Sequence, residues 1–280
     1  MKKIIYSFTL LFAVLFGCNC IASAQIQLNV TKNDSVIIEL GGYKQGTISW
    51  QRSTTGQTFT TMSAYKDKKE LRYKASGPLF FRTKIDDNTC EPVYSDTLQV
   101  NITSLFNVKG GQGYIESAPF VAAEGGLTMR ENGVLSNWSN SQRKPVWFLY
   151  QTPGTYEVSF NIRGSNGLNY QFEMKTSSPG VKAYEPEVFP FEYAGIGSSE
   201  LRKFFTITIP AAGYYRYELN AISSNMNGLT IEDLKFTGIQ EPGKAEPKTY
   251  AESRLFSTSL HMGFSSSANT TKEYDWLYEE

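Results

Sequence analysis

Histidine and cysteine are scarce in this sequence of 280 residues, which contains one histidine and three cysteines. These counts argue against a His-rich zinc site and against a scaffold held together by disulfides. Net charge is also missing, because 27 basic side chains balance 27 acidic ones, so nothing suggests a nucleic-acid partner. The Gly-x-Ser-x-Gly, P-loop and His-Glu-x-x-His motifs do not occur. We therefore expect a protein that is not an enzyme.

Helical periodicity is absent as well, since no stretch repeats apolar residues at the 3.6-residue spacing of an amphipathic helix. Hydrophobic residues still make up 40% of the chain and aromatic residues 14%, which is enough for a packed core. The apolar residues occur in short runs that alternate with polar ones, as in half-buried strands. These patterns predict an all-β protein.

The N-terminus is typical of an export signal. Lys2 and Lys3 begin a basic region, an apolar stretch follows from Ile4 to Gly17, and Ala22-Ser23-Ala24 forms a small-residue cleavage site. The apolar stretch is too short to span a bilayer comfortably. We predict that residues 1–24 are a signal peptide and that the mature chain has no transmembrane span. Its expected location is the periplasm, the cell surface or the surrounding medium.

A lipid anchor is the alternative, because Leu15-Phe16-Gly17-Cys18 resembles a lipobox and would attach the mature chain through Cys18. The bulky Phe16 fits that pattern badly, so we prefer cleavage after Ala24. That cleavage leaves Cys90 as the one remaining cysteine, which cannot form an internal disulfide. We interpret Cys90 as a small, partly buried residue in a turn rather than as a reactive thiol.

Residues 25–103 are predicted to form an immunoglobulin-like (Ig-like) β-sandwich. Val36, Ile38 and Leu40 alternate with more polar neighbours, and Trp50 on the third predicted strand is expected to be buried. The Cys pair of antibody domains is absent. The segment resembles the Ig-like modules of bacterial surface proteins, which often carry one cysteine in the late hairpin. Such modules are usually spacers.

Residues 104–239 are predicted to form a second β-sandwich of the jelly-roll type, like galactose-binding and carbohydrate-binding modules. Tyr156, Val158 and Phe160 should share one face of a strand, because every second residue of a strand points to the same side. Another strand is expected from Gly213 to Leu219, directly after a turn.

The connection from Thr176 to Arg202 contains three prolines, so it cannot be one regular strand. Aromatic residues, among them Tyr184 and Tyr193, are interleaved there with glutamates. Loops of this length are often functional, which makes Tyr184 and Tyr193 candidate ligand-binding residues. The alternative is that these aromatic side chains cap the sandwich.

Residues 240–280 are expected to be a linker followed by an unfinished segment. Residues 240–248 are rich in proline, glycine and charge. The remaining residues, up to Glu280, are too few for an independent core. We interpret these residues as the start of a further domain.

The second sandwich resembles an uncharacterised family, domain of unknown function 5077. The matching pieces are Gly126 to Trp138, Pro153-Gly154-Thr155-Tyr156, Ala212 to Leu219 and Ile231 to Gly238. The C-terminal stretches Ser259 to Phe264 and Tyr274 to Glu280 resemble the beginning of domain of unknown function 3472, which typically follows in that family. Neither family has established catalytic residues, so the resemblance assigns none.

Trp138 is the best candidate for a sugar-stacking platform, because it lies among small polar residues between Asn137 and Asn140. Sugar rings stack on exposed aromatic faces, while amides bind their hydroxyl groups. The alternative is that Trp138 folds back onto the edge of the core. An exposed ring would favour binding, and a buried ring would favour a spacer.

Glu116 and Asp233 are candidate ligands of a structural calcium ion. Jelly-roll modules often take such ligands from their first and last strands, which run side by side, and these two carboxylates occupy similar places. Calcium requires six to eight oxygen ligands. The alternative is that both carboxylates are simply solvated.

The export signal, the jelly roll and Trp138 predict an exported, non-catalytic module of the cell envelope that binds a glycan or another extracellular polymer. One alternative is a structural spacer that presents a missing C-terminal domain. The other is a truncated remnant of a glycan-processing protein.

Overall fold

The computed structural model describes residues 5–10, 25–42, 45–88, 91–109, 114–117, 128–129, 134–136, 138, 143–223 and 226–250. These residues form β-strands almost throughout, with one short 3-10 helix, η1 (Ser63–Tyr65). No helix in this part of the chain is long and apolar enough to cross a membrane. The expected all-β fold class is confirmed.

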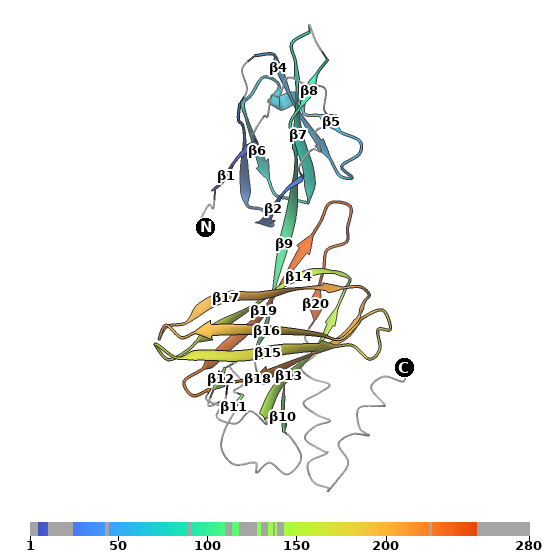
Figure 1. Ribbon diagram of the computed structural model, residues 1–280. Helices are drawn as coiled ribbons and strands as arrows, with labels where there is room; N and C mark the ends of the chain where they lie inside the picture. The colour runs from blue at the N-terminus through green and yellow to red at the C-terminus, as the bar shows by residue number, and fades with distance from the viewer. Residues whose placement is uncertain are drawn as a thin grey trace. The chain divides into compact units, whose positions relative to one another are not determined.

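The chain divides into two compact units, whose strands are labelled in Figure 1. The first unit comprises residues 1–104 and 239–246, and the second comprises residues 105–238 and 247–280. The division lies one residue from the boundary that the sequence predicts. Strand β9 (Thr97–Lys109) supplies residues to both units.

The first unit is built from two groups of paired strands. One group contains β1 (Ile5–Leu10), β3 (Ser35–Leu40) and β6 (Glu70–Lys74). The other contains β2 (Gln25–Thr31), β4 (Thr47–Ser53), β5 (Thr60–Thr61), β7 (Leu79–Asp86), β8 (Val93–Tyr94) and the start of β9. Strand β1, which lies in the segment predicted to be a signal peptide, pairs in parallel with β3.

Alternating residues supply the core of the first unit. Val36 and Ile38 of β3 are fully buried, as the pattern of that strand predicts. Trp50 of β4 is also fully buried, and its indole Nε1 donates a hydrogen bond to the carbonyl oxygen of Lys68 at 2.8 Å. A buried indole needs such a partner for its N–H group. The predicted position of Trp50 in the core is confirmed.

The second unit is a jelly-roll-like sandwich. One sheet has the order β10-β13-β18-β15-β16, and β20 pairs with β13. Its strands are β10 (Tyr114–Ser117), β13 (Arg143–Gln151), β15 (Asn169–Ser177), β16 (Glu187–Ala194), β18 (Gly213–Ala221) and β20 (Thr249–Tyr250). The opposing strands are β11 (Thr128–Met129), β12 (Leu135–Ser136), β14 (Gly154–Arg163), β17 (Glu200–Ile209), β19 (Thr230–Gln240) and the end of β9.

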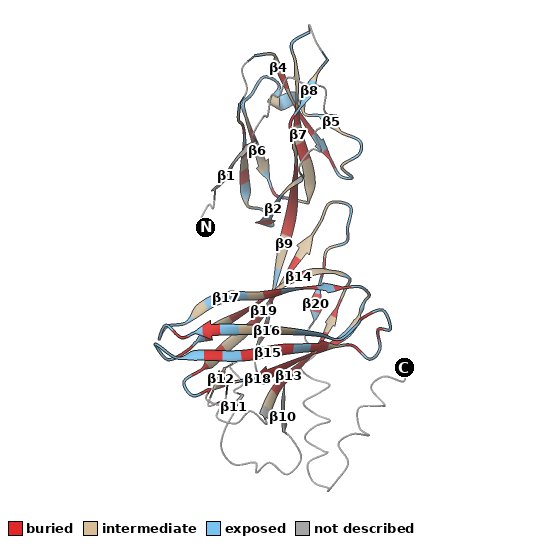
Figure 2. Cartoon of the chain, viewed as in Figure 1, coloured by how far each residue is buried: buried red, intermediate tan, exposed pale blue. Residues whose placement is uncertain are grey.

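Aromatic side chains fill the core of the second unit. Tyr156, Val158 and Phe160 of β14 are fully buried, as predicted from their alternation. From β18, Tyr215 and Tyr217 enter the same core cluster. Figure 2 shows the alternation of buried and exposed positions along the neighbouring strand β15. The intervening residues of β18 must therefore point to the outer face of the sheet.

The predicted long loop from Thr176 to Arg202 is instead largely strand. Residues Glu187–Ala194 form β16, which pairs with β15, and β17 begins at Glu200. Pro190 is accommodated because β16 is the last strand of its sheet, where a residue without an N–H group interrupts no ladder on the open side. The loop prediction was wrong for this reason.

The predicted linker is also ordered. Residues 239–246 belong to the first unit, where the side chain of Ser104 donates a hydrogen bond to Glu246 at 2.6 Å. Residues Thr249 and Tyr250 then form β20 against β13 of the second unit. The segment up to residue 250 is thus part of the two folded units rather than a separate connection.

Candidate functional site

The outer face of β18 carries a row of four side chains, here called the outer strip. Each points away from the core, because the residues between them are core members. Strand β18 lies between β13 and β15, so the strip runs along the interior of the sheet rather than at its edge. The members of the outer strip are Tyr214, Arg216, Glu218 and Asn220.

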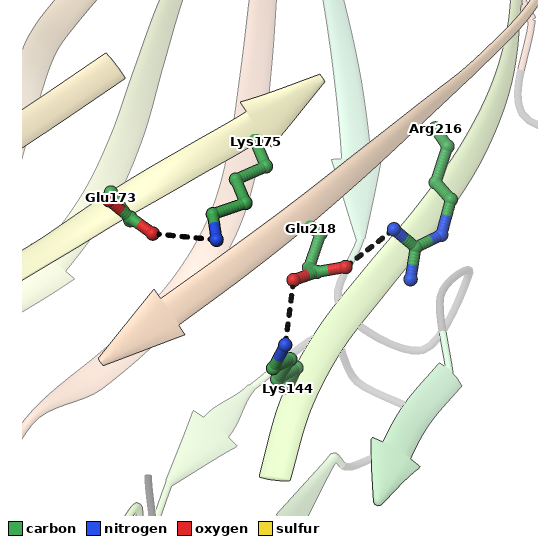
Figure 3. A network of polar contacts seen from close by, with 5 residues as sticks. All are labelled: Lys144, Glu173, Lys175, Arg216 and Glu218. Atoms are coloured by element: carbon green, nitrogen blue, oxygen red, sulfur yellow. Dashed lines mark hydrogen bonds and ion pairs between the residues drawn. The ribbon is translucent and has the colours of Figure 1, made fainter. Parts of the chain in front are cut away.

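An ion pair connects the middle of the strip to β13, and a separate ion pair lies on the neighbouring strand β15 (Figure 3). The two carboxylate oxygens of Glu218 contact Lys144 Nζ at 3.0 Å and Arg216 Nη1 at 2.5 Å. On β15, Lys175 Nζ lies 3.1 Å from a carboxylate oxygen of Glu173. The side chain of Glu218 is only 9% exposed, so its charge is largely removed from water. Two cationic partners compensate for that desolvation.

Glu218 is ionised at neutral pH. Burial by itself would raise the pKa of its carboxyl, but the hydrogen bonds and charges of Lys144 and Arg216 outweigh burial and hold the pKa below the ordinary value of 4.5. A general acid for glycoside hydrolysis needs a raised pKa instead. Glu218 therefore acts as a hydrogen-bond acceptor in a fixed polar network.

We expect the Glu218 network to make folding stability depend on acidity. A carboxyl whose folded-state pKa is lowered stabilises the folded state above its unfolded pKa and loses that contribution as the pH falls through the folded value. Thermal unfolding followed from neutral pH to below 4.5 should thus show a steeper fall in Tm for the natural protein than for Glu218→Gln. Equal slopes would contradict this assignment.

Asn220 ends the strip with an unpaired amide. The residue is 7% exposed, and neither its amide nitrogen nor its amide oxygen has a hydrogen-bond partner among the described residues. Its neighbour on β15 is Glu173. A buried amide without partners costs about 1–3 kcal/mol, so such a group calls for an explanation. A ligand that offers both a donor and an acceptor would satisfy it once the atoms that cover the amide move aside.

Tyrosine rings form the other end of the strip. Tyr214 is 37% exposed and meets Tyr150 of β13 edge to face, with ring centroids 5.3 Å apart. Tyr250 of β20 is 48% exposed, and its ring centroid lies 6.2 Å from that of Tyr150. Exposed rings in contact with one another form an apolar patch beside the charged network. The strip thus joins a surface for stacking to a set of donors and acceptors.

Trp138 does not form the platform predicted from its polar neighbours. It is 1% exposed and belongs to the core cluster of the second unit. A ring with no face open to solvent cannot stack on a sugar, so this prediction was wrong. Asn137 and Asn140, predicted to assist it, lie outside the described residues, as do Cys90 and His261.

Tyr184 and Tyr193, predicted as ligand-binding residues, are also core residues. Tyr184 is 7% exposed, shares a short hydrogen bond with Thr176 and meets Tyr215 edge to face. Tyr193 is fully buried and stacks on Tyr170. The side chains fill the space between the sheets, as the capping alternative anticipated.

The two predicted calcium ligands do not lie on neighbouring strands. Glu116 is on β10, which pairs with β13, whereas Asp233 is on β19 in the opposing sheet. The side-by-side placement assumed for this pair was therefore wrong, since β19 neighbours β9 and not β10. No group of three or more potential metal-ligating side chains occurs among the residues that the structure describes.

Comparison with known families gives one match. Residues 20–104 match the model of a family described as a domain of unknown function (DUF8696). This range covers the first unit up to its boundary in β9 and none of the outer strip. A search of curated proteins finds no match.

Several solved structures are similar to parts of this chain. A family 35 carbohydrate binding module from Clostridium thermocellum is 14% identical, with 48% of this chain and 97% of that chain covered and a TM-score of 0.34. A structure of carbohydrate-binding modules from the β-sandwich superfamily is 12% identical, with coverages of 76% and 93% and a TM-score of 0.35. A family two carbohydrate esterase from Cellvibrio japonicus is 16% identical over 51% of this chain but only 36% of its own, with a TM-score of 0.31. Scores this low carry no argument about function.

Proposed function

We propose that the second unit is a non-catalytic module that binds a glycan along the outer strip of β18. The observation that carries this proposal is the unpaired amide of Asn220 in line with an exposed tyrosine. Tyr214 and Asn220 are six residues apart on one strand, about 20 Å at the rise of a β-strand. That length accommodates a short oligosaccharide rather than a single sugar.

The chemistry of the strip suits a hydroxylated chain. The ring of Tyr214 offers an apolar face for sugar C–H groups, and the amide of Asn220 both donates and accepts hydrogen bonds. Between them, the ionised Glu218 and its cationic partners hold fixed positions before a ligand arrives, which lowers the entropy lost on binding. Export by the N-terminal signal, with a location outside the cytoplasm, is part of the same proposal.

Two substitutions test the strip on a glycan array. We expect Tyr214→Ala to weaken binding about tenfold, since a lost stacking partner costs about 1–1.5 kcal/mol. Asn220→Val should also weaken glycan binding, because the hydrogen bonds from the amide are lost. The same substitution should raise the free energy of unfolding by about 1 kcal/mol, because it removes a buried amide without partners. A stabilised variant that binds less would identify Asn220 as a residue kept for function.

The control is Leu201→Ala, an exposed residue of β17 in the opposing strands, which should bind like the natural protein. Unchanged binding in both strip variants would move the glycan site elsewhere. Absence of glycan binding by the natural protein would instead favour a spacer.

A structural spacer is the second candidate, and the burial of Trp138 favours it. In that case both units would present a further domain, and the resemblance of the second unit to domain of unknown function 5077 would describe a presenting module. The glycan array separates the two proposals, because a spacer has no ligand to lose.

A further inference from the structure

Arg82 of the first unit is held between two aromatic rings. Its guanidinium carbon lies 3.9 Å from the ring centroid of Phe59 and 4.4 Å from that of Tyr94. Phe59 immediately precedes β5, and Tyr94 ends β8, which pairs with β7 on which Arg82 lies. Three separate segments thus converge on one cation. We call these three residues the arginine clamp.

A hydrogen bond also fixes the orientation of the Arg82 guanidinium. Arg82 Nε donates to Gln51 Oε1 at 2.8 Å, and Gln51 lies directly opposite Arg82 on β4. Gln51 is only 9% exposed, so its own position is set by the sheet. Two rings from separate segments contact the guanidinium, and the glutamine holds its Nε. Most of its rotational freedom is therefore lost before any ligand binds.

The terminal nitrogens of Arg82 remain available. Its one hydrogen bond among the described residues uses Nε, and no carboxylate of those residues pairs with it. An arginine fork with fixed orientation matches a carboxylate, which accepts two parallel N–H···O bonds. A surface arginine that served only stability would be expected to pair with a neighbouring acidic side chain. The clamp instead presents an oriented cation that has no carboxylate partner in the part of the chain that the structure describes.

The amides on the strand beside the clamp are buried and bonded to one another. Strand β9 follows β7 in the sheet, and on it Gln99 donates to Asn101 at 2.7 Å, which in turn donates to Asn29 of β2 at 2.9 Å. Gln99 and Asn101 are only 4% and 2% exposed, so an open side chain must supply any further contact with a ligand. Tyr94, at 47% exposed, adds an open ring edge beside the cation.

We propose that the arginine clamp binds the carboxylate of an acidic polysaccharide, with Arg82 as the group that recognises the charge. The clamp lies in the first unit and recognises a carboxylate, so this proposal is independent of the glycan site proposed on the outer strip of β18. Carboxylate is the anion that fits a planar fork, and the exposed ring of Tyr94 offers an apolar surface to the C–H groups of a sugar chain.

Polygalacturonate and its methyl-esterified form test the proposal, because esterification removes the charge and leaves the sugar chain intact. The full-length protein should bind the acidic polymer at least about tenfold more tightly than the ester. Arg82→Lys should lose about tenfold in affinity for the acid form, since an ammonium keeps the charge but not the fork. Tyr94→Ala should weaken binding as well, because one wall of the clamp is gone. Lys84→Gln, which removes a cation from the same strand, is the matched control and should bind normally.

Several outcomes would overturn the proposal. Equal binding of acid and ester would remove the role of the carboxylate. If Arg82→Lys binds the acidic polymer as tightly as the natural protein does, the polymer is attracted by charge alone. An equal loss of affinity in Lys84→Gln and Arg82→Lys would lead to the same conclusion. Polyglutamate bound as tightly as polygalacturonate would assign the clamp to an acidic peptide instead. Thermal unfolding of each variant excludes misfolding as the cause, which is a small risk for the exposed Tyr94.

Discussion

Replacing Trp138 by alanine is expected to lower the free energy of unfolding of the second unit by about 3–5 kcal/mol. The indole is 1% exposed and shares its core cluster with Leu135, Tyr217 and Phe236. Removing it leaves a cavity that the rigid strands around it cannot close, so lost transfer free energy and lost packing add together. The substitution that the sequence would suggest as a binding test is therefore a stability test.

Urea unfolding followed by far-ultraviolet circular dichroism measures this loss without relying on tryptophan fluorescence. Trp138→Phe is the matched control, and it should lose less because a smaller void remains. If Trp138→Ala unfolds like the natural protein but no longer binds a glycan, the result would support the prediction that Trp138 stacks on a sugar.

Ending the chain after Glu246 rather than after Tyr250 is expected to destabilise the second unit by about 2–4 kcal/mol. The four residues removed supply hydrogen-bond partners to several groups of the sandwich, among them the hydroxyl of Tyr156. The amide N–H of Thr152 donates to the Lys248 carbonyl at 3.0 Å, and Gln151 Nε2 donates to Thr249 Oγ1 at 3.1 Å. Gln151 is fully buried, so its amide would lose its partner without gaining water.

Comparison of the two truncated chains isolates the contribution of β20, because both lack residues 251–280. Urea unfolding gives the difference in stability, and faster hydrogen exchange at the Thr152 amide would locate it. Identical midpoints for the two chains would mean that the segment is the simple linker its composition suggests.

Much of the fold is readable from the sequence, because burial repeats every second residue along a strand. The alternation of Tyr156, Val158 and Phe160 predicts their common face, and all three are fully buried. Trp50 was predictable for the same reason, since its neighbours alternate on a strand of a sandwich. Such strands give a strong local signal that requires no knowledge of their partners.

The sequence did not predict the environment of residues whose position depends on tertiary contacts. Trp138 has polar neighbours in sequence, yet a large ring gains more from burial than those neighbours lose. Pro190 indicates a loop unless β16 is known to be the last strand of its sheet. The environment of each residue depends on strands that are distant in the chain.

Only part of the outer strip could be predicted from the sequence. Arg216 and Glu218 alternate with the core residues of β18, so their shared face follows from the sequence. Their partner Lys144 is more than seventy residues away, and only the register of β13 against β18 brings it near. The arginine clamp is harder still, because Phe59, Arg82 and Tyr94 come from three segments.

The chain passes between the two units at residues 104/105, 238/239 and 246/247. A single nick by a protease at any one of these crossings would leave the units covalently joined by the other two. The first unit also includes residues 239–246, which are synthesised only after residues 105–238 of the second unit. During synthesis, the first unit must therefore wait for its last residues until most of the second unit has been made, so the two units cannot be completed in simple N-to-C order.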